Sequence, residues 1–116
     1  MSTSTTILSA QTHVGDSSVQ THTGDKYQGD GYYGRSDGFH TAQFNYTGFL
    51  GTVKLQGTLA TNPVAGDWFD ITGTDITTTY SQDGVDFKNF TGNFVWVRAV
   101  IENWTDGTIN SVLLNH

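Results

Sequence analysis

The chain has no cysteine, and this absence excludes several kinds of chemistry. Its 116 residues contain no thiol that closes a disulfide, ligates a metal or acts as a nucleophile. Disulfides are rare in a reducing cytoplasm, so a cysteine-free chain fits assembly in that compartment. The first eight residues have neither a basic region nor an apolar core, and we therefore expect no secretion signal.

Charged residues and helix-forming residues are also scarce. Charged side chains make up 14% of the chain, the net charge is −6, and only five residues are lysine or arginine. Nucleic-acid binding needs a basic surface, so this composition argues against a nucleic-acid partner. No apolar run reaches the length of a membrane span, which argues against a membrane partner. What is abundant is glycine, threonine, asparagine and aromatic residues, the composition of an all-β protein.

Alternation of apolar and polar residues predicts the strands. Residues 40–46 alternate, with His40, Ala42, Phe44 and Tyr46 on one side, and residues 52–59 alternate in the same way. The run 94–101 is apolar on both sides, which predicts a central strand covered on both faces. Together with shorter segments, the pattern predicts an antiparallel β-sandwich or jelly roll of about seven or eight strands.

Two Asp-Gly pairs indicate tight turns in the second half of the chain. Asp83–Gly84 is expected to close a hairpin between 76–80 and 85–87, and Asp106–Gly107 a hairpin between 94–101 and 108–114. The sandwich domain is assigned to residues 38–116. Residues 1–37 are glycine-rich and poor in apolar anchors, so we expect an extended amino-terminal arm.

The arm contains a repeat that suggests a metal site. Gln11–Asp16 reads QTHVGD and Gln20–Asp25 reads QTHTGD, a period of nine residues. The candidate ligands are His13, His22, Asp16 and Asp25, because imidazole and carboxylate bind zinc or nickel. The alternative, which we favour, is a duplicated turn whose histidines face solvent, so no metal is assigned.

A second acidic group has the oxygen ligands that calcium prefers. Asp67, Asp70 and Asp75 lie near Thr72 and Thr74, but they lack the spacing of a calcium loop, and aspartate is common in turns. For catalysis, His40 with Asp37 and a serine could be arranged as a triad, but the sequence has no nucleophile-elbow glycine pattern. A structural histidine is the better interpretation. We expect no catalytic residue, no cofactor and no enzyme activity.

Aromatic residues are the remaining candidates for a binding function. Tyr27, Tyr32 and Tyr33 lie in the glycine-rich segment and suit either core closure or contact with sugars and proteins. Trp68 and Trp96 are expected in the core. The second side of the run 94–101, with Phe94, Trp96 and Arg98, is a candidate interface between subunits.

Four segments carry a resemblance to a known family. They are Phe49–Leu59, Asp67–Ile71, Asn89–Arg98 and Gly107–His116. Over residues 38–116 the chain resembles a small β-sandwich module of structural proteins of tailed bacteriophages, particularly marine and cyanobacterial phages. The shared motifs are framework residues, and no catalytic residue comes with them.

The resemblance implies a non-enzymatic virion protein that is assembled in the host cytoplasm. Because the chain has no long shaft repeat, we expect a capsid decoration protein on the head surface. The major capsid protein or other virion proteins are the implied partners, and a homo-oligomer, preferably a trimer, is expected. The alternative is a tail-, fibre- or baseplate-associated adhesin or carbohydrate-binding module that contacts a host surface glycan.

Overall fold

A computed structural model describes residues 4–13, 15, 18–33 and 38–115. The described residues form nine strands of one antiparallel sheet and two short 3₁₀ turns, which confirms the all-β class. The strands are β1 (Thr5–Leu8), β2 (Gln11–Thr12), β3 (Gln20–Thr23), β4 (Tyr27–Gln28), β5 (Phe39–Thr58), β6 (Phe69–Asp70), β7 (Ile76–Thr77), β8 (Gln82–Thr91) and β9 (Trp96–Asn115). The turns are η1 (Asp30–Tyr33) and η2 (Ala65–Asp67). None of the described helical segments is long and apolar enough to cross a membrane.

Two strands of 20 residues, β5 and β9, form the centre of the sheet. They pair antiparallel from Thr41 opposite Asn115 to Thr58 opposite Trp96. The other edge of β5 carries β8 and then β7 and β6. The other edge of β9 carries β1 and β2 and then β3 and β4. The central position expected for the run 94–101 is therefore confirmed for residues 96–101, whereas Phe94 and Val95 lie before β9. The expected cover on both faces is wrong for Trp96 and Arg98, which are only half-buried.

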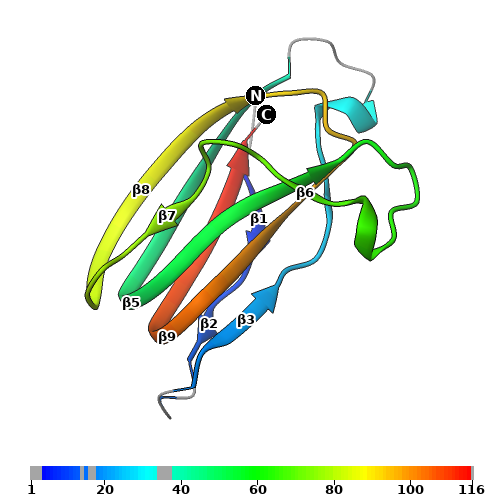
Figure 1. The fold of residues 1–116 in the computed structure, drawn as a ribbon. Helices are drawn as coiled ribbons and strands as arrows, with labels where there is room; N and C mark the ends of the chain where they lie inside the picture. Colours follow the sequence, from blue (N-terminus) through cyan, green and yellow to red (C-terminus); the bar gives the residue numbers. More distant parts are fainter. Residues whose placement is uncertain (1–3, 14, 16–17, 34–37, 116) are drawn as a thin grey trace.

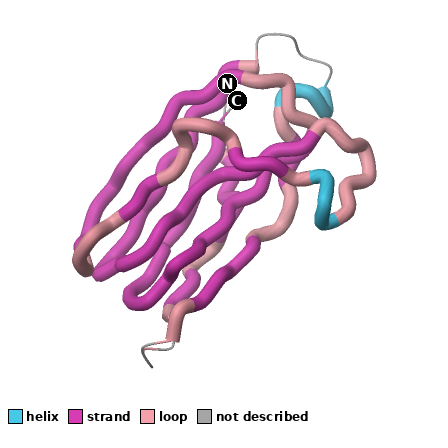
Figure 2. Tube along the Cα trace, viewed as in Figure 1, coloured by secondary structure: helices cyan, strands magenta, loops and turns pink. Residues whose placement is uncertain are grey.

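The sheet bends sharply in the middle of both long strands. Gly48, Gly51, Asn103 and Gly107 adopt positive φ angles there, and the pairing register of β5 with β9 shifts between Thr47 and Thr52. The bend folds the sheet into two layers, as Figures 1 and 2 show. The first layer contains residues 39–47 and 108–115 with β8, β1 and β2. The second contains residues 52–58 and 96–102 with β6, β7, β3 and β4, so the expected sandwich is present.

The core lies between these layers. Even-numbered residues of β5 are buried before the bend, including Phe44 and Tyr46, and odd-numbered residues are buried after it, including Val53 and Leu55. This change of parity follows from the register shift, because each layer must turn its apolar side toward the other. The remaining core residues are Ile7, Leu8, Ala42, Phe49, Ile71, Ile76, Phe90, Val97, Ala99, Ile101, Trp104, Ile109, Val112 and Leu114.

Both predicted Asp-Gly hairpins are wrong. Asp106–Gly107 lies inside β9, where it forms part of the bend while the strand stays paired with β5. Asp83–Gly84 lies inside β8. Leu59, expected on the buried side, is 66% exposed because β5 ends at Thr58. Asp106–Gly107 thus marks a change of direction, but the change occurs within a strand that stays paired with β5.

The amino-terminal segment is built into the sheet. The described part of residues 1–37, expected to be an extended arm, contributes β1 to β4, and all four strands pair with β9. Ile7 and Leu8 are buried in the common core. The described strands of this segment lie along the edge of the sandwich and are part of its sheet.

Candidate functional site

The outer surface of the second layer gathers aromatic and basic side chains. Trp96 and Arg98 of β9 alternate with the buried Val97 and Ala99, so they point away from the core. We call this surface the aromatic face and define it by Lys26, Tyr32, Trp68, Trp96 and Arg98. Its position on a central strand gives it a rigid base.

Trp96 is held in place from three directions. Its indole Nε1 donates a hydrogen bond to the carbonyl oxygen of Thr61 at 3.0 Å. The Lys26 ammonium lies 4.8 Å from the centre of the Trp96 ring, and the Tyr32 ring is tilted against it at 5.1 Å. Cation–π and ring contacts of this kind preorganise a partly exposed aromatic surface.

Arg98 and Trp68 form the second half of the aromatic face. The Arg98 guanidinium lies 4.2 Å above the Trp68 ring, and its Nε donates a 2.9 Å hydrogen bond to Gln56. Partial burial lowers the pKa of Arg98 from its ordinary value. A hollow of about 330 Å³ lies beside this pair. It is lined by Gly24, Asp25, Lys26, Pro63, Val64, Ala65, Trp68 and Arg98.

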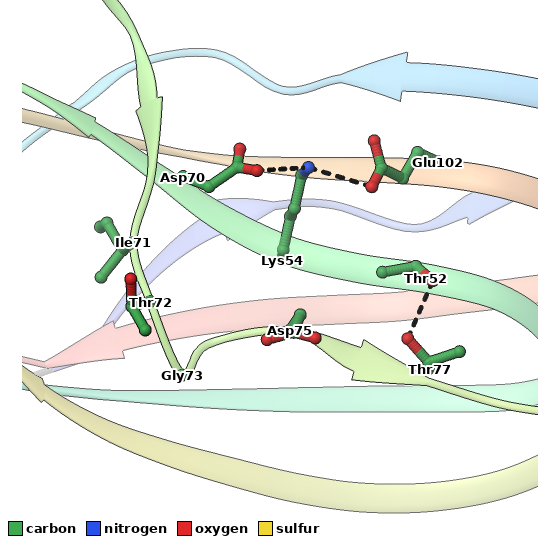
Figure 3. Close-up of a pocket in the computed structure, with 9 residues that line it drawn as sticks. All are labelled: Thr52, Lys54, Asp70, Ile71, Thr72, Gly73, Asp75, Thr77 and Glu102. Atoms are coloured by element: carbon green, nitrogen blue, oxygen red, sulfur yellow. Dashed lines mark hydrogen bonds and ion pairs between the residues drawn. The ribbon is translucent and has the colours of Figure 1, made fainter.

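A chain of polar contacts extends the aromatic face along the second layer. Gln56 donates a 2.9 Å hydrogen bond to Asp70, and the Lys54 ammonium lies 2.9 Å from Asp70 and 3.0 Å from Glu102. Figure 3 shows Lys54 between these two carboxylates. The three residues line a polar hollow of about 380 Å³. The network fixes side chains on three strands, β5, β6 and β9.

The charges of this network shift two pKa values. Hydrogen bonds from Gln56 and Lys54 lower the pKa of the Asp70 carboxyl. Desolvation acts to lower the pKa of Lys54, but its hydrogen bonds to Asp70 and Glu102 outweigh that effect and raise it. Lys54 and Asp70 are therefore both ionised at neutral pH and form an ion pair with each other. The network holds these side chains in position on the surface of the second layer.

Five of the six candidate interface residues separate into two groups. Trp96, Arg98 and Tyr32 lie on the aromatic face. Phe94 instead packs against the core, where its ring contacts Phe90, Phe69 and His40. Tyr27 also packs against the core, opposite Val97. The side chain of Tyr33 lies outside the described part of the structure.

Trp68 and Trp96, which the sequence analysis placed in the core, are half-buried on the aromatic face. The tryptophan that does enter the core is Trp104, which is 3% exposed at the bend of β9. Trp96 lies on the side of β9 that is opposite its buried residues. The alternation of residues in the sequence indicates this position. Lys26, Trp68 and Gln56 join the site only through tertiary contacts, and no local pattern marks them.

The repeated histidines do not form a metal site in the described residues. His13 is buried, its Nε2 lies 2.8 Å from the Ser18 carbonyl oxygen, and its Nδ1 accepts a hydrogen bond from the Gly15 amide at 2.9 Å. His22 and Asp25 line a separate hollow. No cluster of three metal-ligating side chains occurs among the described residues, and Asp16 lies outside them. The interpretation that both histidines face solvent is thus wrong for His13, whose hydrogen bonds stabilise the turn that follows it.

Asp67, Asp70 and His40 have structural partners. Asp67 accepts a 2.9 Å hydrogen bond from the Val64 amide, Asp70 is paired with Lys54, and Asp75 lines the polar hollow. Thr74 is buried and forms hydrogen bonds with the backbone of Ile71 and Leu55, whereas Thr72 lines the polar hollow.

His40 is 2% exposed and stacks on Phe90, and its Nδ1 lies 2.8 Å from the Gly38 carbonyl oxygen. Its suggested partner, Asp37, is not described.

The fold and the face define a class, an all-β two-layer protein with a preformed aromatic surface. No protein-family model and no curated protein matches the chain. The solved structures that are similar to it at low identity include three that represent different proteins. A crystal structure of reduced XRCC1 bound to the DNA polymerase β catalytic domain matches 89% of this chain and 78% of its own, with 11% identity and a TM-score of 0.49.

The other two structures are similarly distant. CBM29_1, a family 29 carbohydrate-binding module from Piromyces equi, matches 97% of this chain and 90% of its own, with 7% identity and a TM-score of 0.47. The Yersinia pseudotuberculosis-derived mitogen matches 84% of this chain and 83% of its own, with 15% identity and a TM-score of 0.34. At such values these likenesses carry no conclusion about function.

Proposed function

We propose that the chain is a non-enzymatic virion structural protein of a tailed bacteriophage. Within that class, we propose a capsid decoration protein that attaches to the head surface by non-covalent contacts. The proposal rests on the sequence resemblance over residues 38–116 and on one structural observation. This observation is the aromatic face, which presents tryptophan, tyrosine and arginine on a rigid sheet.

These residue types are the ones that dominate the energy of protein–protein interfaces. Tryptophan and tyrosine bury large areas with little loss of conformational freedom, and binding hot spots are enriched in both of them and in arginine. Here the rings are already ordered by the contacts of Trp96 with Lys26 and Tyr32, and of Trp68 with Arg98. A preorganised face loses little entropy on docking, which suits a permanent attachment to a particle.

The role as a capsid protein is tested by the copy number in the particle. Quantitative mass spectrometry of virions from the phage that encodes the chain should find it in fixed proportion to the major capsid protein. Capsids that lack it should lose resistance to heat, and added protein should restore that resistance. Virions without the chain, or capsids equally stable without it, would contradict the proposal.

Carbohydrate binding is the second candidate, and the hollow beside Trp68 favours it. Its lining combines an aromatic ring with the charged groups of Asp25, Lys26 and Arg98, a combination that suits sugar stacking and hydrogen bonding. In this role the chain would be a tail- or fibre-associated adhesin. A glycan array with the wild-type chain and with Trp68→Ala tests it. Carbohydrate binding predicts that the wild type binds a glycan on the array and that Trp68→Ala does not. An array on which the wild type binds no glycan would contradict this candidate function.

A further inference from the structure

Strand β8 leaves a long edge of the first layer open. It pairs with β5 over residues 82–91, and no other described strand pairs with it. Figure 1 shows β8 at the outer border of its layer. The free backbone amides and carbonyls of such an edge can pair with another strand.

The outer side of this edge is apolar. Val85 is 67% exposed and Phe87 is 65% exposed, and Phe39 at the start of β5 is 68% exposed. They lie on the solvent side because Val85 pairs with Asn45 and Phe87 with Gln43, which alternate with the buried Phe44 and Ala42. Exposed apolar residues on an open edge are a feature that monomeric β-proteins avoid.

The inner side of the same edge is charged. Asp86 pairs with Phe44 and Lys88 with Ala42, so both side chains are on the core side of the layer. The Tyr46 hydroxyl donates a hydrogen bond to Asp86. Inward charges at an edge normally keep foreign strands away, because pairing would bury a charge without a partner. An incoming strand is therefore accepted only if it brings matching charges.

We propose that β8 pairs antiparallel with β8 of a second copy of this chain, about a two-fold axis at Phe87. This register places Asp86 opposite the partner's Lys88 and Lys88 opposite the partner's Asp86. It places Phe87 opposite the partner's Phe87. Moving the axis to Asp86 or to Lys88 sets two like charges opposite each other, which is destabilising. The charges thus reject other strands and select this one self-complementary register.

The pairing has a defined stoichiometry. A contact that uses the same strand on both subunits about a two-fold axis is closed at two copies. It gives a dimer instead of the trimer expected from the sequence. Interfaces below about 1,200 Å² are typically weak or transient, and one strand edge is small, so we expect dimerisation to depend on concentration. The pairing is independent of the proposed function, because it uses the first layer and leaves the aromatic face open.

Exchanging the two charges tests the register directly. Sedimentation velocity over a concentration series measures association of the wild type, Lys88→Asp, Asp86→Lys and an equimolar mixture of these two variants. We expect the wild type to dimerise and each variant alone to be monomeric, because like charges then face each other. The mixture should regain dimers, because both lysines of one variant then lie opposite both aspartates of the other.

Folding controls keep the outcome interpretable. Circular dichroism and melting temperature establish that each variant is folded, and Phe87→Ser gives a disruption that leaves the Tyr46 contact intact. The proposal predicts that Phe87→Ser also weakens dimerisation. A wild type that stays monomeric, a trimer, unchanged association of Lys88→Asp, or folded variants whose mixture stays monomeric would each overturn it.

Discussion

Tyr46 shows how one side chain connects the core to the edge of the sheet. It is 4% exposed, its ring packs 5.8 Å from that of Phe49, and its hydroxyl donates a hydrogen bond to Asp86. Burial and the neighbouring Asp86 carboxylate raise the pKa of Tyr46 to about 12. Both effects favour the neutral phenol, so ionisation of Tyr46 is expected to destabilise the fold.

This shift predicts a late tyrosine titration. The raised pKa stabilises the folded state fully below the ordinary tyrosine value of about 10, and this stabilisation is lost as the pH rises through about 12. An absorbance titration of the folded chain should show a tyrosinate fraction appearing near pH 12, and Tyr46→Phe should remove it. A Tyr46→Phe titration identical to the wild type would contradict this assignment.

His13 allows a test that separates structure from metal binding. His13→Ala removes the hydrogen bonds to Ser18 and Gly15 and the edge contact with Trp104, so we expect a loss of about 1–3 kcal/mol in the free energy of unfolding. His22→Ala, the matched change in the repeat, should stay within about 0.5 kcal/mol. Adding a chelator should leave the melting temperature of the wild type unchanged. A chelator effect that both variants abolish would instead indicate a metal site.

At the scale of elements, the bend of β5 and β9 depends on glycine. Gly107 has a φ angle of 86°, and a Cβ atom there would lie 2.1 Å from the Gly48 carbonyl oxygen. The backbones of the two long strands therefore approach each other more closely than any side chain allows.

Gly107→Ala should therefore destabilise the fold by about 3 kcal/mol or more, because strain and a backbone clash add. Gly66→Ala is the control, since Gly66 lies in an exposed turn with open space around its Cα, and it should change stability by about 0.5 kcal/mol at most. Denaturant unfolding measures both. Equal effects of the two changes would mean that the bend does not require glycine.

The buried sides of the long strands could be predicted from the sequence, but their connections could not. Alternation identified the buried side over residues 40–46 correctly because each apolar residue there faces the other layer. The same Asp-Gly pair fits a tight turn and a bend within a strand, and only pairing with β5 decides between them. In β8, Val85 and Phe87 lie on one side of the strand and Phe90 on the other, so the two sides cannot both face the core. Phe90 is buried in the core, and Val85 and Phe87 therefore face solvent.

The candidate site was predictable in part for the same reason. Trp96 and Arg98 follow from the alternation of β9. Phe94 lies just before the strand, and its ring covers Gly57, where a Cβ would be 2.8 Å from the Phe94 ring. Because Gly57 has no side chain, the Phe94 ring packs in the space above it. The sequence near residue 94 does not indicate this contact.

At the scale of the whole molecule, both layers share β5 and β9 and should unfold together. Phe44→Ala in the first layer should cost about 3–5 kcal/mol and Leu55→Ala in the second about 2–5 kcal/mol, because both residues are fully buried. Each change should shift one common transition, seen at the same midpoint by near- and far-ultraviolet circular dichroism. Two separate transitions would show that the layers are independent units.

The central claim is that the aromatic face attaches the chain to a capsid. The most direct test is co-sedimentation with capsids that lack the protein, using the wild type, Trp68→Ala and the control Tyr80→Ala. Tyr80 is 66% exposed between β7 and β8, and it is not one of the residues that define the aromatic face. We expect saturable binding of the wild type and of Tyr80→Ala, and binding weakened at least about tenfold for Trp68→Ala. No binding of the wild type, or equal binding of all three, would contradict the claim.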